Sequence, residues 1–452
     1  MDIREIKRLN PWWEDKSSLL NDKHVRSFLS SHIHYLPFDW KRLDAGIYTL
    51  RGLRQIGKTT AMKVLIHRLL QEDVSPRSIL WLVADNMKDR HELVQTLVDI
   101  IPLIDEGKKY IFIDEVSFIK NWQYAIKYVV DSGLIDTDVD VVMLSGSSSI
   151  DIYRGKERLP GRRGNGKDIV FLPITFRQFV SIYKGIDIPS LSLEEVLNMS
   201  EHELKRLWLE YAEFEKDFNV YKTVGGIPSI LNGYISGQSL DKYESVFADV
   251  IIGDMERFGK NRNILKRILA YVINTLGSRF SFSSLASEVE VHTLTAKDYI
   301  DILAYAYVLG IVHFIDISTK RIRPKKQKKV YPADVFLVNV LGRMTGVQAN
   351  REGHLMEVIV YEHLLHMCDT LMGLTGENGP YFWYSDKGKE VDFVIGDIPI
   401  EVKYQKTINP SDYITMKRVW KRGIVLTRSD VGVDSGVVKI PIFLFLLLVD
   451  KY

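Results

Sequence analysis

Residues Gly52–Thr59 have the sequence GLRQIGKT, which fits the pattern G-x-x-x-x-G-K-[ST] of a phosphate-binding loop without a mismatch. In such a loop the backbone N–H groups and the start of the following helix face phosphate oxygens, the lysine reaches the β- and γ-phosphates, and the threonine holds Mg²⁺. The sequence therefore predicts ATP and Mg²⁺ as cofactors. The residues expected at the nucleotide are Gly52, Arg54, Gln55, Ile56, Gly57, Lys58, Thr59 and Thr60.

A second part of this site is expected where apolar strands end in polar residues. YIFIDE, at 110–115, ends in two acids, and we expect Asp114 to hold the metal and Glu115 to polarise the attacking water. The alternative is a strand that merely ends at a charged loop. VVMLSGSSS ends in hydroxyls, so Ser145 or Ser147 is expected to bind the γ-phosphate or the lytic water.

Two arginines follow in RLPGRRGNGK. Arg162 or Arg163 could sense the nucleotide of a neighbouring subunit, which would require a homo-oligomer, or both could belong to a solvated basic turn.

A third candidate site lies near the C-terminal end, in EVDFVIGDIPIEVKYQ at 390–405. Asp392 is expected on one strand and Glu401 with Lys403 on the next, joined by a tight turn. Glu357, on a helix, would join them. Two carboxylates around Mg²⁺ with a nearby lysine suit phosphodiester hydrolysis, so Asp392 and Glu401 are candidate metal ligands, and Glu357 and Lys403 candidate catalytic residues. The alternative is a buried Glu–Lys pair that needs no metal and serves a binding scaffold.

A basic run, KRIRPKKQKK at 320–329, falls where the hairpin tip of a winged helix-turn-helix would lie. Contact with nucleic acid, DNA being the expected form, would relieve its self-repulsion, whereas the alternative is a solvated hairpin tip. The candidate recognition helix offers Lys297 but also Asp298 and Asp301, which favours backbone contacts over base readout. The run contributes Lys320, Arg321, Arg323, Lys325, Lys326, Lys328 and Lys329.

Four segments are expected to position these residues in an α/β protein. Strand-like and amphipathic runs alternate over 48–151, which predicts a parallel sheet with helices on both faces. Helical patterns fill 193–276. The last hundred residues begin with a helix and continue as strands. The predicted domains are 1–190 for an ATPase core, 191–262 for a helical lid, 263–345 for the winged helix and 346–452 for a nuclease-like domain.

The composition is that of a water-soluble globular protein, with 46% hydrophobic residues and a net charge of +2. One cysteine, Cys368, excludes an internal disulfide framework. The longest apolar run, 440–449, is about half of the roughly 20 residues that span a bilayer, and we expect it to form a buried strand or helix. A cytoplasmic location without a membrane partner is expected.

Taken in order, GLRQIGKT, YIFIDE, LSGSSS, PGRRG, LPITFRQF and GGIPSIL give the chain a resemblance to a family of prokaryotic, especially archaeal, AAA-type ATPases. NPWW at 10–13 also looks like a hallmark of this family. The resemblance implies an AAA-like αβα core, a helical lid, a winged helix and a terminal domain of unknown function similar to PD-(D/E)xK nucleases. It assigns nucleotide binding to Lys58 and Thr59, metal and hydrolysis to Asp114 and Glu115, and sensing to Ser145, where many AAA proteins carry asparagine.

The sequence thus leads to one main hypothesis and two rivals. The main hypothesis is a magnesium-dependent ATPase that binds nucleic acid and couples ATP hydrolysis to a nuclease-like domain. The first rival is a nucleotide-switched regulator that binds DNA or protein and whose nuclease-like domain does not cleave. The second is a chaperone-like ATPase that acts on protein.

Overall fold

The computed structural model describes residues 3–105, 107–146, 159–348, 352–368, 376 and 378–451. The chain divides into two compact units, Met1–Leu172 and Pro173–Tyr452. The border lies within the first predicted domain, and the predicted lid, winged helix and nuclease-like segments all belong to the second unit. Each unit is described by itself.

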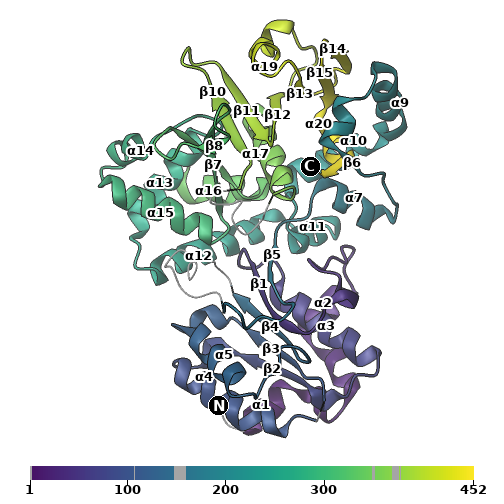
Figure 1. Ribbon diagram of the computed structural model, residues 1–452, viewed down its shortest axis with the longest axis vertical. Helices are drawn as coiled ribbons and strands as arrows, with labels where there is room; N and C mark the ends of the chain where they lie inside the picture. Colours follow the sequence, from purple (N-terminus) through teal and green to yellow (C-terminus); the bar gives the residue numbers. More distant parts are fainter. Residues whose placement is uncertain are drawn as a thin grey trace. The chain divides into compact units, whose positions relative to one another are not determined.

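The first unit is built on a parallel sheet of five strands in the order β2-β3-β4-β1-β5. Figure 1 shows α4 and α5 on one face of this sheet and α2 and α3 on the other. The parallel sheet with helices on both faces is therefore as predicted. Its elements are α1 (Ile3–Leu9), α2 (Lys23–Leu29), β1 (Gly46–Gly52), α3 (Lys58–Gln71), β2 (Ile79–Val83), α4 (Arg90–Ile100), β3 (Tyr110–Asp114), α5 (Trp122–Asp131), β4 (Val141–Gly146) and β5 (Asp168–Phe171).

Continuous apolar strands form the centre of this unit. ILWLV of β2 and YIFID of β3 are buried at nearly every position, as expected for strands covered on both faces. Leu97 of α4 and Ile126 of α5 belong to the same buried cluster as Leu144 of β4. Each such side chain contributes roughly 1.5–3 kcal/mol when fully buried. This packing fixes the strand ends that carry the candidate site.

The NPWW motif covers the edge of the sheet. The Asn10 side-chain amide donates to the carbonyl of Trp81 at 2.9 Å, and the N–H of Trp81 donates to Asn10 Oδ1 at 2.6 Å. The indole N–H groups of Trp12 and Trp13 both donate to the carbonyl of Ile79, at 3.3 and 2.8 Å. Because β2 is an edge strand, these bonds satisfy backbone groups that would otherwise offer a pairing edge.

The second unit contains more helices and a larger sheet. Its helices are α7 (Phe176–Lys184), α8 (Leu193–Leu197), α9 (Glu201–Tyr211), α10 (Glu215–Val224), α11 (Pro228–Ile235), α12 (Leu240–Arg257), α13 (Arg262–Asn274), α14 (Phe282–Glu288), α15 (Thr293–Tyr305), α16 (Val335–Thr345), α17 (Glu352–Leu365), α19 (Ile414–Val419) and α20 (Ile442–Leu448). Its strands are β6 (Leu191–Ser192), β7 (Leu309–Asp316), β8 (Arg321–Ile322), β9 (Lys328–Pro332), β10 (Tyr381–Tyr384), β11 (Glu390–Ile395), β12 (Ile398–Lys403), β13 (Gly423–Thr427), β14 (Gly432–Asp434), β15 (Val437–Pro441) and β16 (Val449–Lys451).

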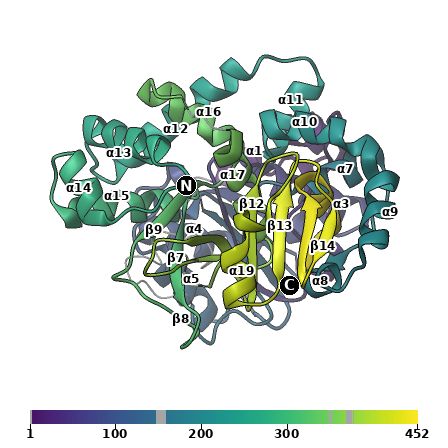
Figure 2. The ribbon, with the colours of Figure 1, turned by 90° about the horizontal axis from the view of Figure 1, so that it is seen from above.

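One mixed sheet joins the predicted wing to the terminal strands. β7 pairs antiparallel with β8 and β9 and parallel with β10, and the sheet continues from β10 through β11, β12, β13 and β15 to β14. Figure 2 shows β12 and β13 side by side, β14 further along the same sheet, and α17 beside β12. The strands expected in two separate domains therefore share hydrogen bonds.

The apolar run near the C-terminal end forms a buried helix, one of its two predicted forms. All seven residues of α20 are buried. In the part of the chain that the structure describes, no helix combines the length and the apolar character needed to cross a bilayer.

The LPITFRQF and GGIPSIL motifs meet at the start of the second unit. The N–H of Ile174 donates to the carbonyl of Gly226 at 2.8 Å, and the Tyr221 hydroxyl donates to the carbonyl of Ile174 at 2.7 Å. Buried Asp334 accepts the N–H of Gly226 at 2.7 Å. A Cβ at Gly226 would lie 2.1 Å from the oxygen of Ile174, which explains the glycine.

Replacing Asn10 with alanine is expected to destabilise the first unit by about 1–3 kcal/mol, because the N–H and the carbonyl of Trp81 both lose a buried partner. Urea unfolding of the full chain measures this, and Asn86→Ala, at an exposed position, serves as the matched control. Equal midpoints for the two variants would show that the motif does not protect the edge of the sheet.

Candidate nucleotide site and acid cluster

The predicted phosphate-binding loop connects β1 to α3. Gly52 has φ 147° and its backbone approaches β5 so closely that a Cβ would lie 2.5 Å from the carbonyl oxygen of Phe171. Gly57 has φ 115° and directly precedes α3. Both values lie in the region that favours glycine. The two glycines thus let the loop turn from the strand into the helix.

Lys58 and Thr59 open α3 and point into the loop region. The Lys58 ammonium donates to the carbonyls of Gly52 at 2.9 Å and Leu53 at 3.0 Å, and only 5% of the residue is exposed. The Thr59 hydroxyl donates to Asp114 Oδ2 at 2.8 Å. Residues 55 apart in sequence are therefore in contact. Among the other predicted loop residues, Ile56 is buried, Gln55 is exposed and the Arg54 guanidinium lies 5.6 Å from the Phe118 ring.

Asp114, Glu115 and Ser145 meet at the carboxyl ends of β3 and β4. The Ser145 hydroxyl donates to Asp114 Oδ1 and accepts the N–H of Glu115 at 2.9 Å. Glu115 has φ 54°, which turns the chain sharply after the strand. Ser145 therefore holds both acids in place. Ser147, the other predicted sensor, lies outside the described residues.

These residues fit a nucleotide with Mg²⁺. Hydroxyl and carboxylate oxygens are the ligands that Mg²⁺ prefers, and those of Thr59 and Asp114 are already in contact. A magnesium nucleotide bound there would supply the phosphoryl group. Lys58 would exchange its carbonyl partners for phosphate oxygens, and the loop N–H groups would bind the remaining ones.

The two predicted sensing arginines are ion-paired within the first unit. Arg162 Nε binds Asp131, at the end of α5, at 2.7 Å. Arg163 binds Asp168 at 3.2 Å, and its carbonyl accepts the N–H of Ile47 near the start of β1. Since the loop lies at the other end of β1, the structure does not bring either arginine to Lys58. Contact with a neighbouring subunit stays a prediction.

Two residues near the loop were not expected from the sequence. His24 Nδ1 lies 3.1 Å from Thr60 Oγ1. Lys63, one turn further along α3, packs against Trp12 and Trp81 at 5.0 and 4.1 Å from the ring centroids. Burial lowers the pKa of Lys63 to about 8. The i to i+4 spacing from Thr59 to Lys63 was the available signal, since it puts both on one face of the helix.

The C-terminal acids come together as predicted. The register that pairs Phe393 with Ile400 puts Asp392 beside Glu401, and both side chains are buried. Lys403 binds Glu401 at 2.7 Å. Glu357 of α17 is also buried, and its Oε2 accepts the Tyr331 hydroxyl at 2.6 Å.

Lys329 is in the middle of these acids, and this corrects its expected place on an exposed hairpin tip. Lys329 is 0% exposed. Its ammonium nitrogen lies 2.5 Å from Glu390, 3.0 Å from Asp392 and 3.5 Å from Glu357. The strand alternation of β9 explains the difference, because it turns Lys329 and Tyr331 to the same inner face. Lys329 is therefore an internal counter-ion and is not available to phosphate.

The charges of the cluster are strongly coupled. Burial raises the pKa of Glu401 to about 8 and that of Glu357 to about 7, and the Asp392 carboxylate adds to both shifts. Burial also tends to raise the pKa of Asp392, but the nearby Lys329 and Lys403 ammonium groups outweigh it and hold this pKa below the usual range. Burial opposes the charge of Lys329, yet the carboxylates around it raise its pKa above the ordinary value. Asp392 and Lys329 are therefore both charged near neutral pH.

This cluster does not fit a divalent cation as it stands. Both oxygens of Asp392 already have donors, Lys329 at 3.0 Å and the N–H of Val402 at 2.9 Å. Glu390 is bound by Lys329 and, at 2.9 Å, by Arg279. Within the described ranges, no group of three or more His, Cys, Asp or Glu side chains is arranged to hold a metal.

The other basic residues of the run differ in exposure. Arg321, Lys325 and Lys326 are exposed, whereas Lys328 is 7% exposed and donates to the carbonyl of Pro324 at 2.7 Å. Lys328 was predicted as an exposed nucleic-acid contact, but it is a buried residue that closes the loop. Lys320 and Arg323 are also exposed but are ion-paired, to Asp397 and Asp316, both at 2.6 Å.

The predicted recognition helix corresponds to α15. Lys297 pairs with Asp301, and Lys260 pairs with Asp298, so the two acids that were expected to repel phosphate are neutralised within the unit. Lys297 remains half-exposed. Its ion pair leaves little free positive charge on this helix.

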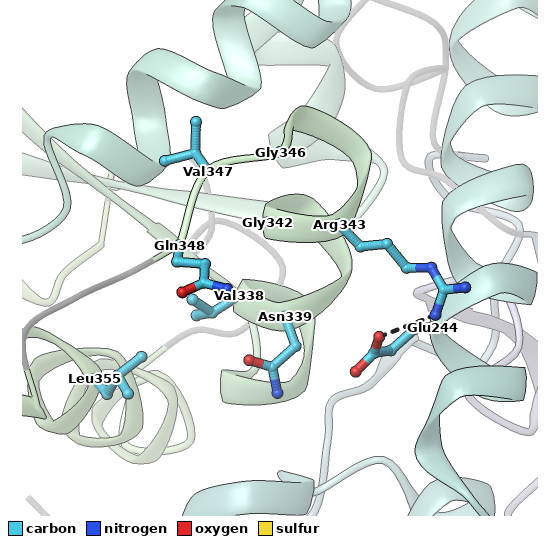
Figure 3. A pocket seen from close by; sticks show the side chains of 9 residues that line it. All are labelled: Glu244, Val338, Asn339, Gly342, Arg343, Gly346, Val347, Gln348 and Leu355. Atoms are coloured by element: carbon cyan, nitrogen blue, oxygen red, sulfur yellow. Dashed lines mark hydrogen bonds and ion pairs between the residues drawn. The ribbon is translucent and has the colours of Figure 1, made fainter.

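A pocket of about 480 Å³ beside α16 is separate from these groups (Figure 3). Val338, Asn339 and Gly342 line it from α16, and Arg343 closes one side through an ion pair of 3.4 Å with Glu244. None of the residues predicted for a site lines it. It is not the candidate site.

Comparison with known families gives three matches along the chain. Residues 44–180, which include the loop and strand ends described above, match a family described as AAA domain. Residues 215–350 and 352–444 match two families that are each described as a domain of unknown function, DUF8612 and DUF4143.

Two uncharacterized proteins of Methanocaldococcus jannaschii are relatives. One is 24% identical over 92% of this chain and 86% of its own length, and the other is 22% identical over 78% and 73%. Among solved structures, the Aeropyrum pernix Orc1 protein in complex with DNA is 12% identical, with a TM-score of 0.29 over 76% of this chain and 93% of that chain. Thermotoga maritima RuvB gives a TM-score of 0.26, with 13% identity over 72% and 91%.

The stability of the second unit is expected to fall between pH 6.5 and 8. Glu357 and Asp334, with pKa raised to about 7, and Glu401, at about 8, hold protons in the folded state that the unfolded chain has already lost. Each of these three acids lowers the free energy of unfolding by up to about 1.4 kcal/mol for each unit by which the pH rises. His363, which is buried, and His366, which is partly buried, both have a pKa lowered to about 4 by desolvation. They act in the opposite sense, and their effect fades as the pH rises through their ordinary pKa of about 6.5.

Urea midpoints at half-unit pH steps measure this slope, and Glu401→Gln is expected to flatten it. Stability that stays constant or rises from pH 6.5 to 8 would contradict the buried, protonated state of these acids.

Proposed function

We propose that the chain is a magnesium-dependent ATPase that binds nucleic acid through its second unit. The contact between Thr59 and Asp114, at the end of a complete phosphate-binding loop, carries the ATPase part of this proposal. The AAA domain match over residues 44–180 supports it.

In this proposal each polar group has one task. Lys58 and the loop N–H groups bind the β- and γ-phosphates, and Thr59 with Asp114 holds the metal. Glu115 accepts a proton from the attacking water, which makes it the general base. Ser145 positions the two acids through its bonds to Asp114 and to the N–H of Glu115.

Two variants are expected to affect ATP binding and ATP hydrolysis separately. Lys58→Ala is expected to weaken ATP binding at least about tenfold because a charged phosphate contact is lost. Glu115→Gln should retain affinity while turnover falls about 10²–10⁴-fold, the usual contribution of a general base. Fluorescent-nucleotide titration and phosphate release measure the two quantities.

Lys88→Ala, an exposed lysine of the same unit, is the matched control. Unchanged ATP affinity in Lys58→Ala would remove the ATPase assignment, whereas normal turnover in Glu115→Gln would remove only the role of Glu115.

The exposed cations after β7 carry the nucleic-acid part of the proposal. Arg321 lies on β8, and Lys325 and Lys326 lie in the loop between β8 and β9. All three are exposed, and the Lys326 ammonium lies 5.6 Å from the rings of Phe314 and Tyr384. Arg279 stacks over Tyr384 at 4.3 Å. Phe314 is buried and Tyr384 is partly buried, so the rings pack against the cations, and phosphate is the group proposed to contact this surface. DNA is the proposed form, and the helices α13 to α15 followed by β7 and β9 are consistent with a winged helix.

The terminal acids support the non-cleaving alternative for the nuclease-like segment. Their oxygens are bound by Lys329, Lys403 and Arg279. We therefore propose a nucleotide-controlled nucleic-acid-binding protein whose terminal strands serve as a scaffold.

Changing Arg321, Lys325 and Lys326 together to alanine should weaken DNA binding and lower the dependence of log K on log salt by up to about 0.9 for each lost phosphate contact. Fluorescence anisotropy at several salt concentrations measures both. The control is the triple alanine variant of Lys205, Lys216 and Lys242, which are also exposed in the second unit. If the two triple variants have the same slope, the loop does not contact phosphate.

A further inference from the structure

The acid cluster already contains a cation supplied by the chain. Lys329 of β9 reaches Glu390 and Asp392 of β11 and Glu357 of α17, at 2.5, 3.0 and 3.5 Å. These carboxylates come from two distant segments and surround one point. Carboxylates that converge in this way are typical of divalent-cation sites, where the oxygens lie about 2.0–2.6 Å from the ion.

We propose that the ammonium group of Lys329 takes the cation position of this cluster, so that the native protein excludes divalent cations there. The cluster then joins β9, β11 and α17 as a permanent structural ion network. It also contains a latent metal site, which opens when Lys329 is replaced by an uncharged side chain of similar length. This inference does not depend on the proposed ATPase activity.

Two observations oppose the simultaneous presence of Lys329 and a metal. The ammonium is fully buried and lies within 3.5 Å of three carboxylates, so an added divalent cation would meet a positive charge in a weakly screened interior. In addition, each of the three carboxylates has a second donor. Val402 binds the other oxygen of Asp392, Arg279 binds the other oxygen of Glu390, and Tyr331 binds the Glu357 oxygen that faces Lys329. A metal would therefore have to displace the lysine and compete with these donors.

The test counts bound Mn²⁺ by electron paramagnetic resonance on the full chain without nucleotide. Wild type and Asp392→Asn should bind the same number of ions. Lys329→Met should bind one more ion than wild type, and the added Asp392→Asn change should remove it. Lys439→Met removes a partly buried lysine paired with Asp430 elsewhere in the unit, and this control should gain no ion.

Several results would overturn the proposal. The first is a Mn²⁺ ion bound by wild type and lost in Asp392→Asn, and the second is Mn²⁺-dependent nicking of plasmid DNA by wild type that Asp392→Asn abolishes. A folded Lys329→Met chain that gains no ion would also overturn it. If Lys329→Met unfolds without metal, refolding on addition of Mn²⁺ supports the proposal, and continued unfolding contradicts it. Because nucleotide is absent, these outcomes are independent of ATP binding.

Discussion

Burial of the Lys329 charge is the constraint around which the second unit is organised. An isolated ammonium ion in a protein interior is costly, so it requires carboxylates at contact distance, and the chain supplies them from β11 and α17. Once these partners converge, β9 can no longer move independently of the terminal strands. The pairing of β7 with β9 on one side and with β10 on the other makes the same connection through the backbone.

The two candidate sites differ in what holds their carboxylates. Asp114 is bound by the neutral hydroxyls of Thr59 and Ser145, which can turn their oxygens toward a metal without leaving a charge unpaired. Asp392 is bound by an ammonium group, and displacing it would leave Lys329 buried without its partner. An aspartate on a strand is therefore suited to metal binding in the first unit and to neutralising a buried lysine in the second. The identity of the partner, more than that of the acid, decides the chemistry.

Sequence patterns predicted the local parts of this structure and missed those that depend on distant contacts. The phosphate-binding loop, the acids at the end of β3 and the parallel sheet of the first unit follow from local motifs and from the alternation of apolar strands with amphipathic helices. Asp392 and Glu401 were also predicted, because a tight turn fixes their register. Lys329 was assigned to an exposed run because six other basic residues surround it, and burial depends on tertiary packing. The alternation of Lys329 with Tyr331 in an apolar strand was the signal that could have separated it.

A short covalent connection links the nucleotide loop to the second unit. Phe171 pairs with Gly52, and its ring would lie 3.6 Å from a Cβ at Gly57, so β5 is packed against both ends of the loop. Pro173, two residues further on, has its carbonyl 2.9 Å from His366 Nε2, and Ile174 is bound by Gly226 and Tyr221. Only Leu172 separates the residue at the loop from the residues held by the second unit. The LPIT motif therefore spans the border between the two units, with Phe171 before it held at the phosphate-binding loop and Ile174 within it held by the GGIP motif.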